Sequence, residues 1–163
     1  MAFERVKRTR RGDFQVRLPE GERELLRSLP EQLRGLLTSG DAATDPALRR
    51  LFPPPTMDDE AINAEFERLM RDELVAERLA ALETMERTLG AERLSEDELV
   101  AWLSAINDLR LVLGVRLDVS EETTVADFTS LPDDDPRVLM YAAYSYLTFL
   151  EDHVVGALAG GSE

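Results

Sequence analysis

Apolar residues recur at every third or fourth position through most of this chain, and this spacing limits its fold more than any other feature does. Such spacing places apolar side chains on one side of an α-helix. Leu and Ala dominate the apolar residues, whereas the β-branched and aromatic residues that favour strands are few. The sequence therefore predicts a mainly α fold, a single-domain helical bundle, with helices over residues 20–38, 45–51, 58–89, 95–113 and 135–158.

Local signals predict where these helices begin, bend and end. Ser95 and Glu98 have the spacing of a capping box, which opens an α-helix. Pro30 falls inside the first helical segment and predicts a kink or a short break. Gly114 is expected to end the fourth helix. In the last segment apolar side chains cover more than half of the helix circumference, which is typical of a central helix.

The long segment 58–89 changes its apolar side halfway along. Ile62, Phe66 and Leu69 share one side of a helix, as do Met70 and Leu74. The apolar residues of the second half point in a direction rotated by roughly 150° from the first. Either the helix breaks near residues 72–73, or its halves pack against different bodies, one on the core of the chain and one on a second subunit. The second alternative predicts a homodimer.

The N-terminal residues alternate between polar and apolar instead. This alternation around Gly12 predicts a β-hairpin, which must pack on the rest of the chain because two strands alone are marginal in water. Residues 115–119, VRLDV, alternate as well and are expected to supply a third short strand. One domain over residues 1–163 is expected, with the hairpin at 3–18, the helical bundle at 19–159 and a disordered tail at 160–163.

The charge of the chain is unevenly distributed. Its formal net charge is −14, yet residues 5–11, RVKRTRR, contain five cations in seven positions. Such a strip can dock on an acidic surface of a partner protein or of a second copy, with an attraction that weakens as salt rises. The simpler alternative is a hairpin whose cationic side only faces solvent. The predicted partner-binding residues are Arg5, Lys7, Arg8, Arg10 and Arg11.

Three polar residues interrupt the apolar face of the fourth helix. Arg110 falls near the middle of that face, where a cation needs a carboxylate or carbonyl partner. Asn107 and Asp108 precede it. The three residues are predicted to form a local buried polar network that fixes helix packing.

Motifs for catalysis and metal binding are missing from the sequence. There is no cysteine, which excludes disulfides, cysteine-type zinc sites and thiol switches. His153 is the one histidine, and Leu150 stands where the Glu-x-x-His motif of a di-iron bundle needs glutamate. No Gly-x-Ser-x-Gly elbow or P-loop occurs. We therefore expect no catalytic residue, no cofactor, no metal and no enzymatic activity.

The same charge and hydropathy patterns bear on location and partners. An acidic body repels phosphate backbones, so autonomous nucleic-acid binding is not expected. No stretch reaches the roughly 20 apolar residues that span a bilayer, and the N-terminus lacks the apolar core of a signal peptide. A cytoplasmic protein without membrane contact is expected.

Several segments of the chain resemble a known family. They are RVKRTRRGDFQVRLPEGERELLRSL at residues 5–29, DPALRRLFPP at 45–54, AWLSAINDLRLVLGVRL at 101–117 and YSYLTFLEDHV at 144–154. In this order they resemble an actinobacterial family of domains of unknown function, described as the oxidative-stress transcription regulator AosR. The NDLRLVLG stretch is the most specific part of the resemblance.

The resemblance implies that the protein regulates by contacting the transcription machinery rather than by enzymatic turnover. The component contacted would be RNA polymerase or a sigma factor. One departure matters, because a reversible redox switch ordinarily uses cysteine thiols and this chain has none. Direct oxidant sensing by thiols is therefore not expected of it. Two other functions stay open: an adaptor for regulated proteolysis or another assembly, and an enzyme with an unrecognised carboxylate site.

Overall fold

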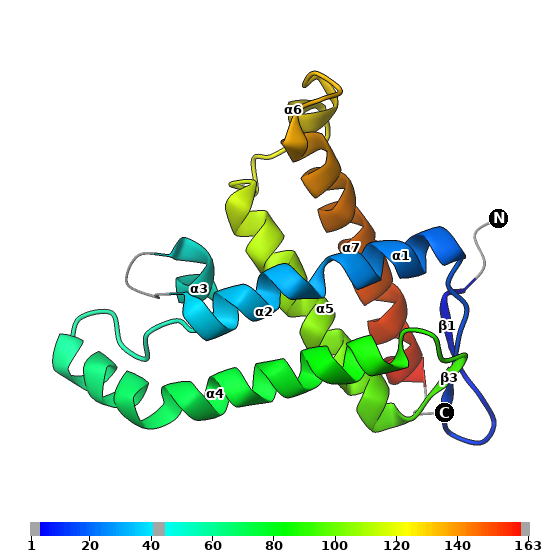
Figure 1. Cartoon of the computed structure of the whole chain (residues 1–163), viewed down its shortest axis with the longest axis horizontal. Helices are drawn as coiled ribbons and strands as arrows, with labels where there is room; N and C mark the ends of the chain where they lie inside the picture. The colour runs from blue at the N-terminus through cyan, green and yellow to red at the C-terminus, as the bar shows by residue number, and fades with distance from the viewer. Residues whose placement is uncertain (1–3, 41–44, 161–163) are drawn as a thin grey trace.

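The computed structural model describes residues 4–40 and 45–160 and shows a mainly α fold with one small sheet (Figure 1). The helices are α1 Glu20–Ser28, α2 Pro30–Ser39, α3 Pro46–Leu51, α4 Glu60–Thr88, α5 Glu96–Arg116, α6 Ala126–Thr129 and α7 Pro136–Ala159. The strands are β1 Val6–Arg8, β2 Phe14–Val16 and β3 Arg93–Leu94. The predicted fold class is confirmed. Residue 3 of the predicted hairpin and residues 161–163 of the predicted tail lie outside the described ranges.

The sheet begins with the predicted hairpin, which is confirmed. β1 and β2 pair antiparallel, with Val6 opposite Val16. Gly12 lies in the connecting turn at φ 91°, a conformation that glycine adopts without steric cost. β3 pairs with the other edge of β2 and places Leu94 opposite Phe14, giving the order β1-β2-β3. These four apolar side chains are buried, so one face of the sheet covers the core.

The third strand comes from a different part of the chain than the sequence suggested. The predictions of a strand at 115–119 and of a helix end at Gly114 are both wrong. α5 continues past Gly114, and the backbone N–H of Leu117 still donates to the carbonyl oxygen of Leu113 at 2.9 Å. A Cβ atom at Gly114 would lie 3.3 Å from the ring of Tyr144. The glycine therefore permits close approach of α5 and α7 rather than ending the helix.

Pro30 divides the first helical segment as predicted. α1 ends at Ser28, and Pro30 occupies the first position of α2. The missing N–H of a proline costs no helical hydrogen bond at that position, because the first N–H groups of a helix have no partner within it. The break at this residue is confirmed.

α4 is unbroken from Glu60 to Thr88, so the alternative of a break near residues 72–73 is wrong. The Asp59 side chain caps its start by accepting from the N–H of Ile62 at 3.0 Å. In the second half of α4, Leu82 and Met85 are fully buried. The first half extends away from α5 and α7 (Figure 1), and Ile62 is 50% exposed there.

α5, not the last helix, is central. It contacts α2, α3, α4, α7 and β3, and its start carries the predicted capping box between Ser95 and Glu98. The prediction of a central last helix is wrong, since α7 packs mainly on α5, α6 and β1 and leaves Leu139 76% exposed. The wide apolar arc of α7 has another cause: Tyr141 stacks on Phe128 of α6, with ring centroids 4.3 Å apart.

One cluster of buried apolar residues joins the sheet to the helices. Phe14 and Trp102 are fully buried in it. The indole N–H of Trp102 donates to Thr88 Oγ1 at 2.7 Å, which satisfies its polar atom inside the core. Among the described helices, none combines the length and the apolar character needed to cross a membrane.

Acid should weaken the ion pair that joins the start of α3 to the end of α5. Both carboxylate oxygens of Asp45 accept from Arg116, each at 3.0 Å, and one also accepts from the N–H of Ala47. The Arg116 hydrogen bond is the main cause of a lowered pKa at Asp45. The stabilisation is therefore complete above the ordinary aspartate pKa of about 3.9 and is lost as the pH falls through the lower folded value.

Asp45→Asn keeps a helix-capping oxygen but removes the charge. We expect this variant to be less stable than the wild type at about pH 7, with a difference that shrinks as the pH falls below the ordinary aspartate pKa of about 3.9, as measured by urea unfolding at a series of pH values. A stability difference that does not depend on pH would contradict the ion-pair interpretation.

Candidate functional site

The outer face of the sheet presents a row of polar side chains across all three strands. Lys7 lies opposite Gln15, and Gln15 lies opposite Arg93. Side chains directly opposite in neighbouring strands share a face of the sheet, and alternation places these three on the side away from the buried Phe14 and Leu94. The sheet thus has an apolar inner face and a polar, cationic outer face.

Three further arginines adjoin this row. Arg10 and Arg11 are exposed in the turn between β1 and β2. Arg17 follows β2 and donates to the side chain of Gln15 at 3.2 Å, so it lies on the same face. We call the set of Lys7, Arg10, Arg11, Arg17 and Arg93 the cationic sheet face.

Two acids lie at the cationic sheet face, and one of them, Glu92, lines a shallow pocket together with Gln15 and Arg17. Asp13 lies 3.6 Å from Arg93 and accepts a hydrogen bond from the hydroxyl of Thr9. The Thr9 hydrogen bond, with a smaller effect of Arg93, lowers the pKa of Asp13. Asp13 and Glu92 compensate two of the five cations, so the face keeps a net positive charge in a chain of net charge −14.

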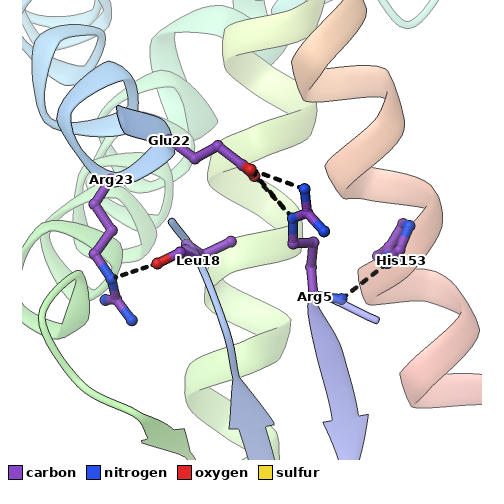
Figure 2. Close-up of polar contacts among 5 residues, drawn as sticks. All are labelled: Arg5, Leu18, Glu22, Arg23 and His153. Carbon is purple, nitrogen blue, oxygen red and sulfur yellow. Dashed lines mark hydrogen bonds and ion pairs between the residues drawn. The ribbon is translucent and has the colours of Figure 1, made fainter. Parts of the chain in front are cut away.

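Arg5, the first residue of the predicted strip, holds the hairpin onto two helices (Figure 2). Its guanidinium group donates to both carboxylate oxygens of Glu22 in α1, with the shortest distance 2.9 Å. The same group lies over the ring of Phe149 in α7, 5.3 Å from the ring centroid. The Arg5 backbone N–H donates to His153 Nδ1 at 3.2 Å. Because this ion pair is largely buried, Arg5 serves the fold.

The base of the hairpin has two further polar attachments near Arg5. Arg23 of α1 donates to the carbonyl oxygen of Leu18 at 3.2 Å (Figure 2) and also to the carbonyl oxygen of Leu89. Tyr146 of α7 is packed beside Glu22, and burial is the main cause of its raised pKa, with Glu22 adding to it. These contacts join the base of the hairpin to α1, to α7 and to the residue that follows α4.

Arg8 also turns toward the fold. Its guanidinium group lies over the Phe14 ring at 4.6 Å and donates to the carbonyl oxygen of Leu158, in the last turn of α7, at 3.4 Å. Glu96 lies 4.0 Å away. A cation at a helix C-terminus is favourable because the last carbonyl groups lack helical partners.

The predicted strip therefore divides into two groups. Arg5 and Arg8 fasten the hairpin, whereas Lys7, Arg10 and Arg11 are exposed. Their role in partner binding stays a prediction. Sequence reasoning missed Arg17, which strand alternation could have placed on the same face, and Arg93, for which no local signal exists because β3 has two residues and follows a long helix.

The second predicted cluster divides as well. Asp108 is 1% exposed and forms an ion pair with Arg78 of α4, while Arg110 lies 2.8 Å from Glu151 of α7. Asn107 joins neither pair. The prediction of one local network is wrong, because helical spacing directs Asp108 toward α4 and Arg110 toward α7. Burial raises the pKa of Asp108, and Arg78 acts in the opposite direction.

Metal-binding groups were also sought among the described residues. In residues 4–40 and 45–160, no three His, Asp or Glu side chains are arranged to hold a metal ion. The sheet face offers cationic and amide groups instead, which can bind carboxylates or other anions through charge-assisted hydrogen bonds.

The chain belongs to the family described as "Domain of unknown function (DUF2017)", which matches residues 2–158. Its relatives include the protein named "Oxidative stress regulator AosR" in Mycobacterium bovis and in Mycobacterium tuberculosis. Each is 30% identical over 184 residues, covering 90% of this chain and 83% of the relative. The "Putative oxidative stress regulator AosR" of Mycobacterium leprae is 34% identical over 131 residues, covering 70% and 58%. The resemblance inferred from the sequence is confirmed. No solved structure matches the chain.

Proposed function

We propose that this protein is a non-enzymatic regulator that binds an acidic surface of the transcription machinery through its cationic sheet face. The observation that carries the proposal is the clustering of five cations on and beside one face of the sheet in an acidic protein, four from the hairpin segment 7–17 and one, Arg93, from β3. Opposite charge speeds and orients association between proteins. The names of the relatives support a regulatory role in oxidative stress.

The proposed partner is RNA polymerase or a sigma factor, and the proposed location is therefore the cytoplasm. A second candidate is an adaptor for regulated proteolysis or another assembly, which would use the same face on a different partner. Neither of these two functions needs a deep pocket, whereas an enzyme with a carboxylate site would need one that is ringed by acids. The homodimer stays a prediction.

Affinity capture from a native lysate tests the partner. The wild type and the triple variant Lys7→Glu/Arg10→Glu/Arg11→Glu would be immobilised and their bound proteins identified by mass spectrometry. We expect the wild type to recover RNA polymerase or a sigma factor and the variant to lose it, because three attractive charges become repulsive. Recovery of a protease or chaperone would favour the second candidate, and equal capture by the two would remove the face from the proposal. Circular dichroism would check that the variant is folded.

A further inference from the structure

The first half of α4, which extends away from the sheet (Figure 1), carries an exposed apolar stripe. Ile62, Phe66 and Leu69 follow one another at spacings of four and three residues, so they lie on one side of the helix. They are 50%, 37% and 62% exposed. Neighbouring exposed apolar side chains of this size mark interaction sites more often than isolated ones do.

A groove runs beside this stripe. It has a volume of about 570 Å³ and lies between α4 and the segment from Phe52 to Met57. Phe66 borders both the groove and the stripe, and Leu74 lines the end of the groove. The volume falls in the range of about 300–1,000 Å³ that is typical of pockets for bound groups.

The fold itself holds the groove open. The backbone N–H of Thr56 donates to Asn63 Oδ1 at 3.1 Å, and Asn63 Nδ2 donates to the carbonyl oxygen of Thr56 at 3.0 Å. The guanidinium group of Arg71 lies over the Phe52 ring, 4.5 Å from its centroid. Both ends of the segment are thereby fixed to α4, so a partner would meet a preformed surface, which lowers the entropic cost of binding.

The charges around the stripe indicate the chemistry of its partner. Residues 58–74 contain seven acids and two arginines. Both arginines are engaged within α4, Arg68 with Glu65 and Arg71 with Glu67. At 100° per residue, Asp72 lies along one edge of the stripe and Glu73 continues its line, and neither has an ion-pair partner among the described residues.

A second copy of the chain would be a poor occupant, because it would bring its own Asp72 and Glu73 against the same acids. The opposite wall of the groove carries the exposed cation Arg49, so the side chain that enters the groove should be apolar rather than basic. The surface therefore suits a partner with apolar residues in its centre and cations along one edge.

We propose that the stripe and groove bind a basic amphipathic helix of another protein. Its apolar side covers Ile62, Phe66 and Leu69, and one large apolar side chain enters the groove. Lysine or arginine residues along one edge of the helix pair with Asp72 and Glu73. This docking mode, an apolar helix side laid in a preformed groove, recurs in peptide recognition. The protein then has two contact surfaces of opposite charge, at opposite ends of α4.

Fluorescence anisotropy with three labelled synthetic peptides tests this proposal. The first peptide has leucine at the core positions of a heptad repeat and lysine at the flanking positions, the second has the same composition in scrambled order, and the third has glutamate in place of lysine. We expect the full chain to bind the first peptide at least about tenfold more tightly than either of the others, because only the first offers both an apolar side and cations.

Variants locate the binding surface. Phe66→Glu and the double variant Asp72→Lys/Glu73→Lys should each weaken binding of the first peptide about tenfold or more, because they place a charge in the apolar contact or reverse the attraction. Leu139→Glu, at a more exposed apolar residue on α7, is the matched control and should leave binding unchanged. Amide chemical shifts on titration should change mainly within residues 52–74.

Four results would overturn the proposal. Equal binding of the scrambled peptide would show charge attraction without a site, and equal binding of the glutamate peptide would remove the acids from the contact. Shift changes confined to other regions would place the site elsewhere. A dimer in light scattering that Phe66→Glu dissociates would show that a second copy covers the stripe. Because Phe66 is partly exposed, its variant should fold, and circular dichroism checks this.

Discussion

Replacing Arg78 by methionine is expected to lower the free energy of unfolding by about 3–5 kcal/mol, the cost of leaving one partner of a buried ion pair without the other. Arg78 of α4 pairs with Asp108 of α5 and also donates to the carbonyl oxygen of Leu51, at the end of α3, at 3.3 Å. Asp108 is 1% exposed, and its Oδ2 atom has no hydrogen-bond partner among the described residues. The substitution would therefore leave a buried carboxylate without compensation.

Urea unfolding monitored by circular dichroism measures this effect, and two variants control it. Arg68→Met removes an exposed pair with Glu65 on the same helix and should cost no more than about 0.5 kcal/mol. The double variant Arg78→Met/Asp108→Leu replaces the pair by apolar groups and should recover most of the stability. If Arg78→Met were as stable as Arg68→Met, the pair would contribute nothing measurable to the packing of α3, α4 and α5.

Replacing Thr88 by valine is expected to cost about 1–3 kcal/mol, because the indole N–H of Trp102 would be buried without an acceptor. Thr88 Oγ1 accepts from Trp102 at 2.7 Å and donates to the carbonyl oxygen of Thr84 at 2.7 Å. Valine keeps the shape of threonine but has no polar atom. The packing of the core therefore changes little, and the measured loss reports the hydrogen bond.

Trp102 is the one tryptophan of the chain, so its fluorescence reports unfolding and its own surroundings together. Thr88→Ser keeps the hydroxyl and is the matched control, expected to lose less stability than Thr88→Val although it creates a small cavity. The emission of Thr88→Val should also shift relative to the wild type. Serine and valine variants of equal stability would contradict a stabilising role of this hydrogen bond.

Most of the helices could be predicted from local patterns. The capping box at Ser95 and the break at Pro30 depend on neighbouring residues alone, and both appear in the structure, whereas the apolar pattern of residues 58–89 left open whether α4 breaks. Gly114 shows where a local rule fails, because its small size serves the contact with Tyr144 instead of a helix end. The central position of α5 could not be predicted either, since it depends on which helices pack together.

The candidate site could be predicted only in part, for the same reason. The clustering of cations in residues 5–11 marked the hairpin as a candidate binding site, and Lys7, Arg10 and Arg11 are exposed on it. The spacing of a strand could not show that Glu22 of α1 would pair with Arg5, because that contact joins two separate elements. Arg93 joins the cationic sheet face through pairing with β2, a contact between segments far apart in the sequence.

Whether the cationic sheet face binds an acidic protein surface is tested most directly by an affinity measurement. The ligand is the partner protein that the chain captures from the lysate. Isothermal titration calorimetry would compare the wild type with two triple variants. The first is Lys7→Glu/Arg10→Glu/Arg11→Glu. The second, Arg27→Glu/Arg50→Glu/Arg87→Glu, changes the net charge by the same amount at exposed helical sites. The first triple variant should bind about tenfold or more weakly, the second should bind within about threefold of the wild type, and wild-type affinity should fall as salt rises. Equal weakening by both triple variants, or no weakening by the first, would contradict the assignment of the contact to this face.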